Sequence, residues 1–385
     1  MKNKLQLNYC LMQIGLWGSY GFLFAYANRY LLEQGLSNTE VGLLLGVVTA
    51  LAFILQPLLT AVVDRSRLRC REVLMLSTGL MALCCLGLLI FPGLWAQMLF
   101  YSGGCTALQI LPSFSNAAGM AAIHRGSRLN FGIARGLGGL SFGIAAQTAQ
   151  PLMKLMGLSA IPVATAILCI PLILSCLPFS YDAVSAEEEK PDPMLTFFRK
   201  NRSFATFLVA ATLLYMGHNA LCNCMYQIAV YKGDGNAQGT ATLISAVCEL
   251  PTMFFFTRML RRMGSGKWVC LSGIFIGLRL LLSLLLPGIA GFYAAQICQL
   301  LGFSLFAVSS VHYVGQRIDK RNVVKGQTYL GITNTLGCLI SSFGAGALID
   351  RFGVDMMVYA FSAVSAAGAI LLFASVQEKE AAPLK

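Results

Sequence analysis

The chain has 385 residues, of which 57% belong to the hydrophobic set and 11% are charged. Soluble proteins carry roughly 25% charged residues, so this composition excludes an ordinary soluble domain and indicates a protein that crosses a membrane many times. The formal net charge of +12 would suit a nucleic-acid-binding protein only if the basic residues shared one accessible face, and they are instead spread over many short loops.

Apolar runs of about 20 residues, the length that spans a bilayer, alternate with polar loops, and we count twelve of them. The runs cover residues 7–30, 39–62, 72–91, 94–120, 129–152, 158–179, 203–231, 239–260, 267–287, 290–315, 326–349 and 355–376. An acidic linker with prolines lies at 181–202. The sequence therefore predicts an all-α membrane protein with 12 transmembrane helices in two six-helix bundles, at residues 1–180 and 203–376, and a tail at 377–385.

Lysine and arginine are distributed unequally between the two sides that this topology defines. One side has 22 of these residues, including both termini and the linker, and the other side has four: Arg29, Lys154, Lys232 and Arg351. Because cytoplasmic loops carry the excess of basic residues, the termini, the linker and the tail are expected in the cytoplasm. We therefore expect a multi-pass protein of the plasma (inner) membrane, with no nucleic-acid partner.

The two halves resemble each other in sequence. Residues 130–143, in the fifth run, and 328–344, in the eleventh, place glycine and phenylalanine similarly. Parallel repeats of this kind suit two bundles with pseudo-two-fold symmetry about an axis along the membrane normal. In that register Asn334 is expected opposite Arg135.

Arg135 is surrounded by small and apolar residues, and an arginine within a bilayer is costly unless it faces a wet cavity or a partner. Glycines recur beside it at intervals of four, three and four, which predicts a smooth helix face for close packing against another helix. These glycines are Gly132, Gly136, Gly139 and Gly143. The alternative is that Arg135 extends to the membrane surface from near the helix end. We favour the cavity.

Glu249 and Arg279 are a second pair of charged residues within apolar runs. A lone buried carboxyl group tends to be neutral unless it is paired, and Arg279 is the available partner. If water and substrate reach the pair, Glu249 could take or release a proton, and His218 could take part. A purely structural ion pair between the eighth and ninth runs fits the sequence equally well.

Amides and aromatic side chains at helical spacing outline a predicted substrate pathway. They would offer hydrogen bonds to the edges of a sugar or aromatic solute and ring faces to its flat surfaces, although packing remains the alternative for any single residue. Two arginines against one glutamate favour a carboxylate-bearing ligand, and a neutral glycoside held by Arg135 fits equally well. The predicted substrate-binding residues are Arg135, Asn116, Gln109, Trp17, Tyr20, Asn219, Tyr226, Gln296, Gln299, Phe303 and Asn334.

After the second run, Asp64 is followed by spaced basic residues at Arg65, Arg67 and Arg69. With twelve runs in two halves, this pattern resembles the loop signature of the major facilitator superfamily, although Thr60 stands where the signature usually has glycine. The resemblance implies that these four residues form a cytoplasmic gate.

The chain further resembles the branch that contains lactose permease and the phenylpropionate permeases, over nearly its whole length. Residues 131–135 look like the branch's substrate-binding arginine segment, Glu249 and Arg279 like its buried acid and arginine, and 217–220 like the phenylpropionate type. Gln299 stands in place of the usual histidine, and Gly302 in place of the acid of lactose permease. The resemblance implies roles in proton coupling for Glu249, Arg279 and His218, and it makes lactose itself a poor candidate substrate.

We therefore expect a secondary active transporter for a small organic solute of the sugar or oligosaccharide, nucleoside or aromatic-carboxylate type. It is expected to work by alternating access as a proton symporter, as a monomer in the lipid bilayer, with small-molecule substrate and H⁺ as its partners. An exporter or a uniporter is the alternative. No nucleophile elbow, phosphate loop or metal-ligand spacing occurs in the sequence, so we expect no enzyme activity, no cofactor and no metal.

Overall fold

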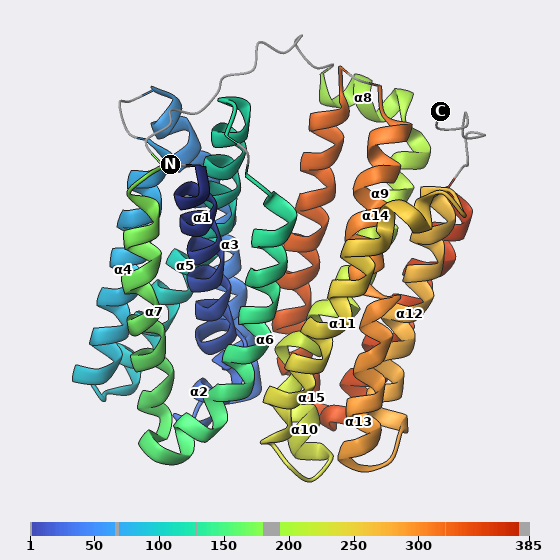
Figure 1. The fold of residues 1–385 in the computed structure, drawn as a ribbon. Helices are drawn as coiled ribbons and strands as arrows, with labels where there is room; N and C mark the ends of the chain where they lie inside the picture. The colour runs from blue at the N-terminus through green and yellow to red at the C-terminus, as the bar shows by residue number, and fades with distance from the viewer. Residues whose placement is uncertain (1, 66–68, 128, 180–192, 320, 377–385) are drawn as a thin grey trace. The chain divides into compact units, whose positions relative to one another are not determined.

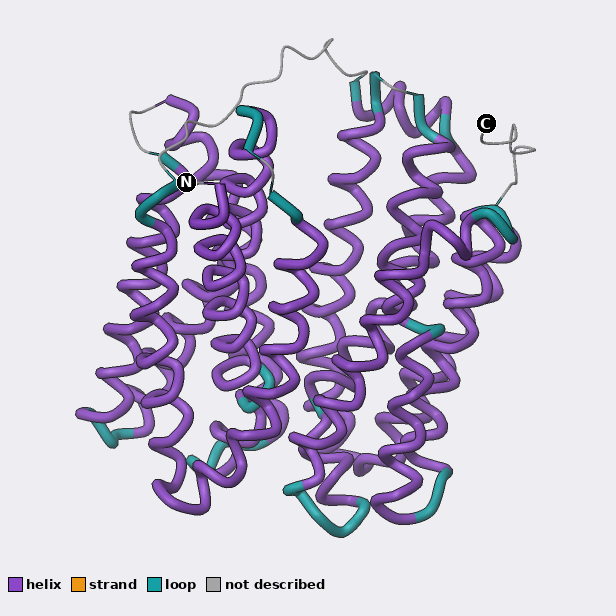
Figure 2. The backbone as a smooth tube through the Cα atoms, in the orientation of Figure 1, coloured by secondary structure: helices purple, strands orange, loops and turns teal. Residues whose placement is uncertain are grey.

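The computed structural model describes residues 2–65, 69–127, 129–179, 193–319 and 321–376, and the structural statements refer to these residues. Helices make up nearly all of this backbone, and the loops that join them are short (Figure 2). The chain divides into two compact units, Met1–Ser185 with Asn236–Val247, and Ala186–Gly235 with Cys248–Lys385. One helix, α11 (Ala237–Leu260), therefore contributes to both units.

The first unit is built from long helices and short helical turns (Figure 1). Helix α1 packs against α5, α6 and α7, and α4 packs against α5 and α7. The elements are α1 (Lys2–Ser19), the π-helical turn η1 (Tyr20–Phe24), α2 (Ala27–Glu33), α3 (Asn38–Arg65), α4 (Cys70–Ile90), α5 (Leu94–His124), α6 (Phe131–Met156), the 3₁₀ turn η2 (Gly157–Ser159) and α7 (Ala160–Cys176).

The second unit has its most extensive packing between α9 and α15, and α12 packs against both of them and against α14. Its elements, besides the second half of α11, are α8 (Met194–Lys200), α9 (Arg202–Asn223), α10 (Met225–Tyr231), α12 (Ser265–Leu285), α13 (Gly288–Gln296), the 3₁₀ turn η3 (Ile297–Leu300), α14 (Phe303–Arg317) and α15 (Val323–Ser375).

Eight helical stretches of the described chain are long and apolar enough to cross a membrane. The stretch at Phe131–Cys176 has 46 residues and α15 has 53. At about 1.5 Å per residue, each is more than twice the ~30 Å thickness of the hydrocarbon core. Gly353, with a φ of 89°, interrupts α15, because this backbone conformation is open to glycine and not to an α-helix. Both stretches thus have the length of two spans.

The predicted runs coincide with helices, but three of them are interrupted. The run at 7–30 contains η1 and a break at Ala25–Tyr26, the run at 203–231 is broken at Cys224, and the run at 290–315 contains η3 and a turn at Leu301–Gly302. The sequence did not indicate these interruptions. The expectation of an all-helical membrane protein agrees with the described residues, while the arrangement of 12 spans in two six-helix bundles stays a prediction.

Close contact between backbones holds α9 and α15 together. A Cβ atom built on Gly337 would lie 2.6 Å from the Tyr215 Cβ and 3.0 Å from the Met216 backbone nitrogen, and one on Gly217 would meet the Ser365 hydroxyl. Small residues at such points let membrane helices approach until their backbones touch, which is the main source of packing energy in lipid. This contact fixes the face of α9 that carries His218 and Asn219.

Candidate functional site

Arg279 on α12 is the centre of a polar cluster inside the second unit. Its side chain is buried, with 2% of its surface exposed. The Nε and Nη2 atoms donate to Gln296 Oε1 at 3.0 and 2.7 Å, and Nη1 donates to Gln299 Oε1. Because a buried guanidinium needs acceptors for its N–H groups, these amide oxygens offset part of the cost of burying Arg279.

Gln299 connects this arginine to the predicted proton carrier. Its Oε1 accepts from Arg279, and its Nε2 donates to Glu249 Oε1 at 2.8 Å. The three residues come from α12, η3 and α11, so the cluster ties three elements of the second unit together. Glu249 was predicted to pair with Arg279, and the structure places the amide of Gln299 as a bridge between the two charged groups.

The local fold at residues 297–302 explains this placement. The helix tightens to a 3₁₀ turn at η3 and then turns at Gly302, whose φ and ψ of −87° and −114° lie outside the helical region. A 3₁₀ turn has three residues per turn, so positions three apart lie above one another and Gln296 and Gln299 both face α12. Gln296 also donates to the Ser283 hydroxyl at 3.2 Å, which fixes its orientation.

His218 on α9 stacks against Phe303 at the start of α14. The two ring centroids are 3.9 Å apart and the rings are within 4° of parallel, and the imidazole is buried with 9% exposed. Cys222 Sγ lies 3.6 Å from His218 Nε2. His218, predicted for proton coupling, and Phe303, predicted for substrate binding, are thus in stacking contact.

Asn219 and Asn334 are also brought together, since Asn219 Nδ2 donates to Asn334 Oδ1 at 3.1 Å. Tyr226, another predicted substrate-binding residue, lies on α10 beyond the break at Cys224, close to Gly235.

A second polar cluster lies inside the first unit, around Trp17. The guanidinium carbon of Arg135 sits 4.0 Å from the centre of the Trp17 ring, a cation–π distance. Trp17 Nε1 donates to Gln13 Oε1 at 3.0 Å, and the Trp17 and Tyr20 rings stack with centroids 5.1 Å apart. Three predicted residues, Arg135, Trp17 and Tyr20, therefore belong to one cluster, with Arg135 partly buried and not extended to the surface.

Gln13 connects this cluster to the neighbouring helix. Its Nε2 donates to Tyr9 Oη at 3.1 Å and to Ser115 Oγ at 3.0 Å. Tyr9 and Ser115 were missed at the sequence level. Tyr9 could have been found from the spacing of four residues between Tyr9, Gln13 and Trp17, because positions four apart share a helix face.

The glycines of α6 form the expected close packing in part. A Cβ built on Gly143 would lie 2.9 Å from Leu243 and Ala246 of α11, and one on Gly138, which was not predicted, would lie 2.6 Å from Trp17. Gly132 is exposed, and the nearest atom to a Cβ on Gly139 is Arg135 Nη1 of the same helix, so these two glycines do not make the expected approach to another helix.

Two further predicted residues, Gln109 and Asn116, lie on α5. Gln109 accepts through its backbone oxygen from Gln56 Nε2 at 3.0 Å, and Asn116 on α5 is exposed. Of the predicted gate, Arg67 and the side chains of Asp64 and Arg65 lie outside the described residues. Arg69 begins α4, and its backbone N–H donates to Glu72 Oε2 at 2.9 Å.

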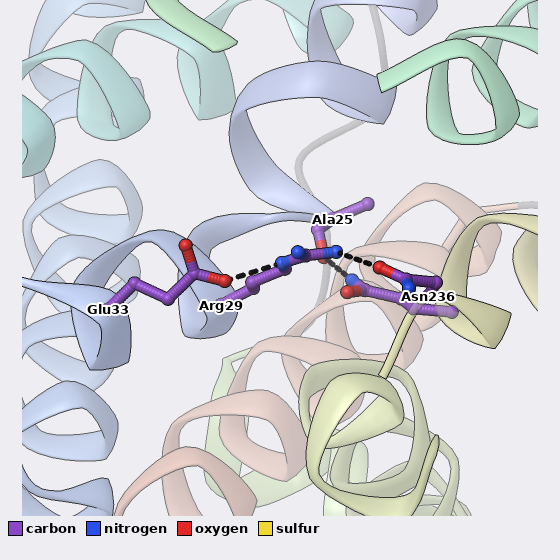
Figure 3. A network of polar contacts seen from close by, with 5 residues as sticks. Ala25, Arg29, Glu33 and Asn236 are labelled. Atoms are coloured by element: carbon purple, nitrogen blue, oxygen red, sulfur yellow. Dashed lines mark hydrogen bonds and ion pairs between the residues drawn. The ribbon is translucent and has the colours of Figure 1, made fainter. Parts of the chain in front are cut away.

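A polar network that the sequence did not predict joins α2 to the start of α11 (Figure 3). Arg29 Nε donates to Glu33 Oε1 at 2.7 Å, and its Nη1 donates to Asn236 Oδ1 at 3.4 Å. Gln238 Nε2 donates to the Ala25 carbonyl oxygen at 2.5 Å. These bonds, with Gly239 close to Ala146, place the first half of α11 in the first unit.

Comparisons with known proteins agree with this architecture. The model of the family described as MFS_1 like family matches residues 7–376. A search of the curated protein sequences finds no match.

Solved structures of transporters share the fold. A mutant of the nucleoside transporter NupG has a TM-score of 0.79 at 17% identity, over 98% of this chain and 100% of that one. An auto-inhibited POT family peptide transporter has a TM-score of 0.74 at 11% identity, over 97% and 96%. A bacterial homolog of the human lysosomal transporter Spinster, inward-facing and unoccupied, has a TM-score of 0.62 at 12% identity, over 97% and 95%.

Proposed function

The chain belongs to the MFS_1-like family, and on that premise we propose that it is a secondary active transporter that imports a small organic solute together with protons. Transport is proposed to occur by alternating access, in which the two halves of the chain move relative to one another. The family and the fold shared with transporters support transport in general, and two polar clusters within apolar helices support the specific form.

The bridge from Arg279 through Gln299 to Glu249 carries the proposal of proton coupling. When Glu249 is ionised, the Gln299 N–H donates to a charged oxygen, and the amide dipole is oriented by the guanidinium on its other side. When Glu249 is protonated, that hydrogen bond becomes a neutral and weaker one. Protonation of Glu249 thereby changes the strength of the hydrogen bonds that connect Gln299 to Arg279. A residue that couples proton movement to a conformational change requires such a link. His218, stacked on Phe303 in the same unit, is the proposed second member.

The substrate that we propose is a small solute that combines a flat ring with hydroxyl groups, as nucleosides and glycosides do. In the first unit, Trp17 and Tyr20 offer stacked ring faces and Arg135 offers donors; in the second unit, Asn219 and Asn334 offer donors and acceptors for hydroxyl edges. The nucleoside transporter NupG shares the fold and supports including nucleosides in this class. An aromatic carboxylate is the second candidate, because the two clusters contain two arginines and one glutamate.

The proposal includes the membrane arrangement expected from the sequence. The chain would cross the plasma (inner) membrane twelve times, with both termini cytoplasmic, and Asp64, Arg65, Arg67 and Arg69 would form a cytoplasmic gate. The match between the predicted apolar runs and the helices supports the number of crossings, and the excess of basic residues on one side supports the orientation.

The experiment that tests this function has two steps. A thermal-shift screen of sugars, nucleosides and aromatic acids on the purified protein identifies a ligand, because a ligand at 100 times its Kd stabilises the folded state by about 2.7 kcal/mol. Uptake of that ligand into proteoliposomes is then measured with and without an imposed pH gradient, acidic outside. Accumulation that a protonophore abolishes is the expected result. Uptake that is unaffected by the gradient would identify a uniporter, and resistance to lipophilic compounds on overexpression would identify an exporter.

A further inference from the structure

A groove in the second unit lies between the first half of α12 and the end of α15. It has a volume of about 520 Å³ and is lined by Met263, Gly266, Lys267, Cys270, Leu271, Ile274, Phe373 and Val376. None of these residues belongs to the Arg279 cluster or to the His218 pair. The groove is therefore separate from the proposed transport site.

The groove is polar at one end and apolar along its length. Lys267, Leu271 and Ile274 are four and three residues apart, so they follow one face of α12, and the lysine lies in the first turn of the helix. Ile274 lies roughly 10 Å farther along the helix axis than Lys267. Ile274 and Phe373 keep 46% and 58% of their surfaces exposed, so the apolar part is open on the outer surface of the unit.

The chain around the polar end of the groove is strongly basic. Arg258 lies in the last turn of α11, and Arg261 and Arg262 are exposed in the loop just before Met263 of the groove. The sequence has no acidic residue from 250 to 318. The groove thus has a basic end and apolar walls. A ligand that matches both parts is an amphiphile with an anionic headgroup.

The position of this basic end along the helices fits a membrane surface. Both α11 and α12 have the length and composition of membrane spans, so the loop that joins them lies at a boundary between lipid and water. Trp268 in the first turn of α12 donates from Nε1 to the Met259 carbonyl at 3.1 Å, which fixes the two ends of the loop to each other. Tryptophan is enriched at this depth of the bilayer.

From these observations we infer that the groove binds an anionic phospholipid, with the headgroup phosphate at Lys267, Arg261 and Arg262 and an acyl chain along Leu271, Ile274 and Phe373. Basic pockets between membrane helices hold anionic headgroups through charge and hydrogen bonds. A lipid bound here contacts α12 and α15 together. Since α12 also carries Arg279, the bound lipid stabilises the unit that holds this proposed coupling residue.

The test is native mass spectrometry of the full chain in detergent with added palmitoyl-oleoyl phosphatidylglycerol, or with the phosphatidylcholine of the same chains. We expect the wild type to retain the anionic lipid preferentially and to gain thermal stability from it. Lys267→Gln, which removes the cation, should weaken retention about fivefold, since a cation near an anionic surface contributes about 1 kcal/mol. Ile274→Trp, at an exposed position, should weaken retention by filling the apolar part.

Arg321→Gln is the matched control, because it removes one exposed cation from the loop before α15 and should leave retention unchanged. Equal binding of phosphatidylcholine, or wild-type retention in both groove variants, would overturn the inference. An equal loss in Arg321→Gln would show general charge attraction only. Stabilisation by inorganic phosphate alone would indicate an ion site, and lipid retention that appears only after removal of residues 377–385 would identify this chain's own tail as the occupant.

Discussion

Neutral amide groups accept hydrogen bonds from the buried guanidinium of Arg279. The acceptors include the oxygens of Gln296 and Gln299, and the Gln299 amide also donates to Glu249. Removing one partner of a buried charged group typically costs several kcal/mol. Transport by Glu249→Gln therefore separates a coupling role of this cluster from a structural one.

Trp17 should report ligand binding in the first unit. Trp17→Phe keeps a ring beneath Arg135 and removes the N–H that donates to Gln13, so we expect ligand affinity to fall about fivefold, the equivalent of one hydrogen bond of about 1 kcal/mol. The ligand-induced change in tryptophan fluorescence should disappear in the same variant. Trp95→Phe is the control, since Trp95 is 82% exposed. A fluorescence change that persists without Trp17 would contradict a binding role for this cluster.

The residue types of the candidate site could be predicted from the sequence, while their partners could not. Arg135, Glu249 and Arg279 are charged residues within apolar runs. Because it costs free energy to place a charge inside a membrane, the sequence indicated them as candidate functional residues. The bridge from Arg279 through Gln299 to Glu249 depends on the 3₁₀ turn of η3, and no local sequence pattern predicted this turn. The break at Cys224, which separates Tyr226 from the helix of His218, was not indicated by the sequence either.

Packing between α9 and α15 in the second unit depends on glycine positions where the two backbones leave no room for a side chain. The backbone of α15 at Gly337 lies against the α9 backbone at Tyr215 and Met216. Because α9 presents His218 toward Phe303 from the following residues, a shift of this contact would move the histidine as well.

Gly337→Val should therefore lower the apparent Tm of the purified protein, by an amount that corresponds to about 1–3 kcal/mol of overpacking. Gly331→Ala on the same helix is the matched control. A Cβ there has nothing within 4 Å, so alanine should raise stability by about 0.5–1 kcal/mol through its better helix propensity. A thermal unfolding series in detergent measures both. Equal stability of Gly337→Val and the wild type would show that the α9–α15 contact can relax.

Helix positions could be predicted from the sequence because membrane helices need long apolar runs, and each run coincides with helix in the structure. The interruptions within the helices could not be predicted from the sequence. Pro57, Pro112, Pro151, Pro171 and Pro251 all lie inside helices, whereas the breaks at Ala25–Tyr26 and Cys224 have no proline or glycine. Such breaks are set by packing between helices, which overrides local propensity.

For the whole molecule, the distribution of lysine and arginine makes a prediction about orientation. Alkaline phosphatase fused after Lys385 should be inactive, because that enzyme needs the oxidising side of the membrane, and a fluorescent protein at the same position should fluoresce. Phosphatase fused after Asp234, in the loop between α10 and α11, should be active. The opposite pattern would contradict the proposed cytoplasmic termini.

The family of the whole chain could be anticipated, since twelve apolar runs in two halves and the loop signature resembled one superfamily. The division of α11 between the two compact units could not be anticipated. It arises from contacts such as Arg29 with Asn236 and Gly143 with Leu243, between segments about a hundred or more residues apart. Only packing in three dimensions decides such contacts.

Proton coupling through Glu249 is tested most directly by transport of Glu249→Gln in proteoliposomes. This variant keeps an acceptor for the Gln299 N–H and removes the titrating group. We predict that uptake driven by a pH gradient falls to the level seen without a gradient, while exchange of labelled for unlabelled substrate at equal pH is retained, and that Glu33→Gln, which alters the Arg29 pair, leaves driven uptake intact. Undiminished gradient-driven uptake by Glu249→Gln would contradict the proposed coupling.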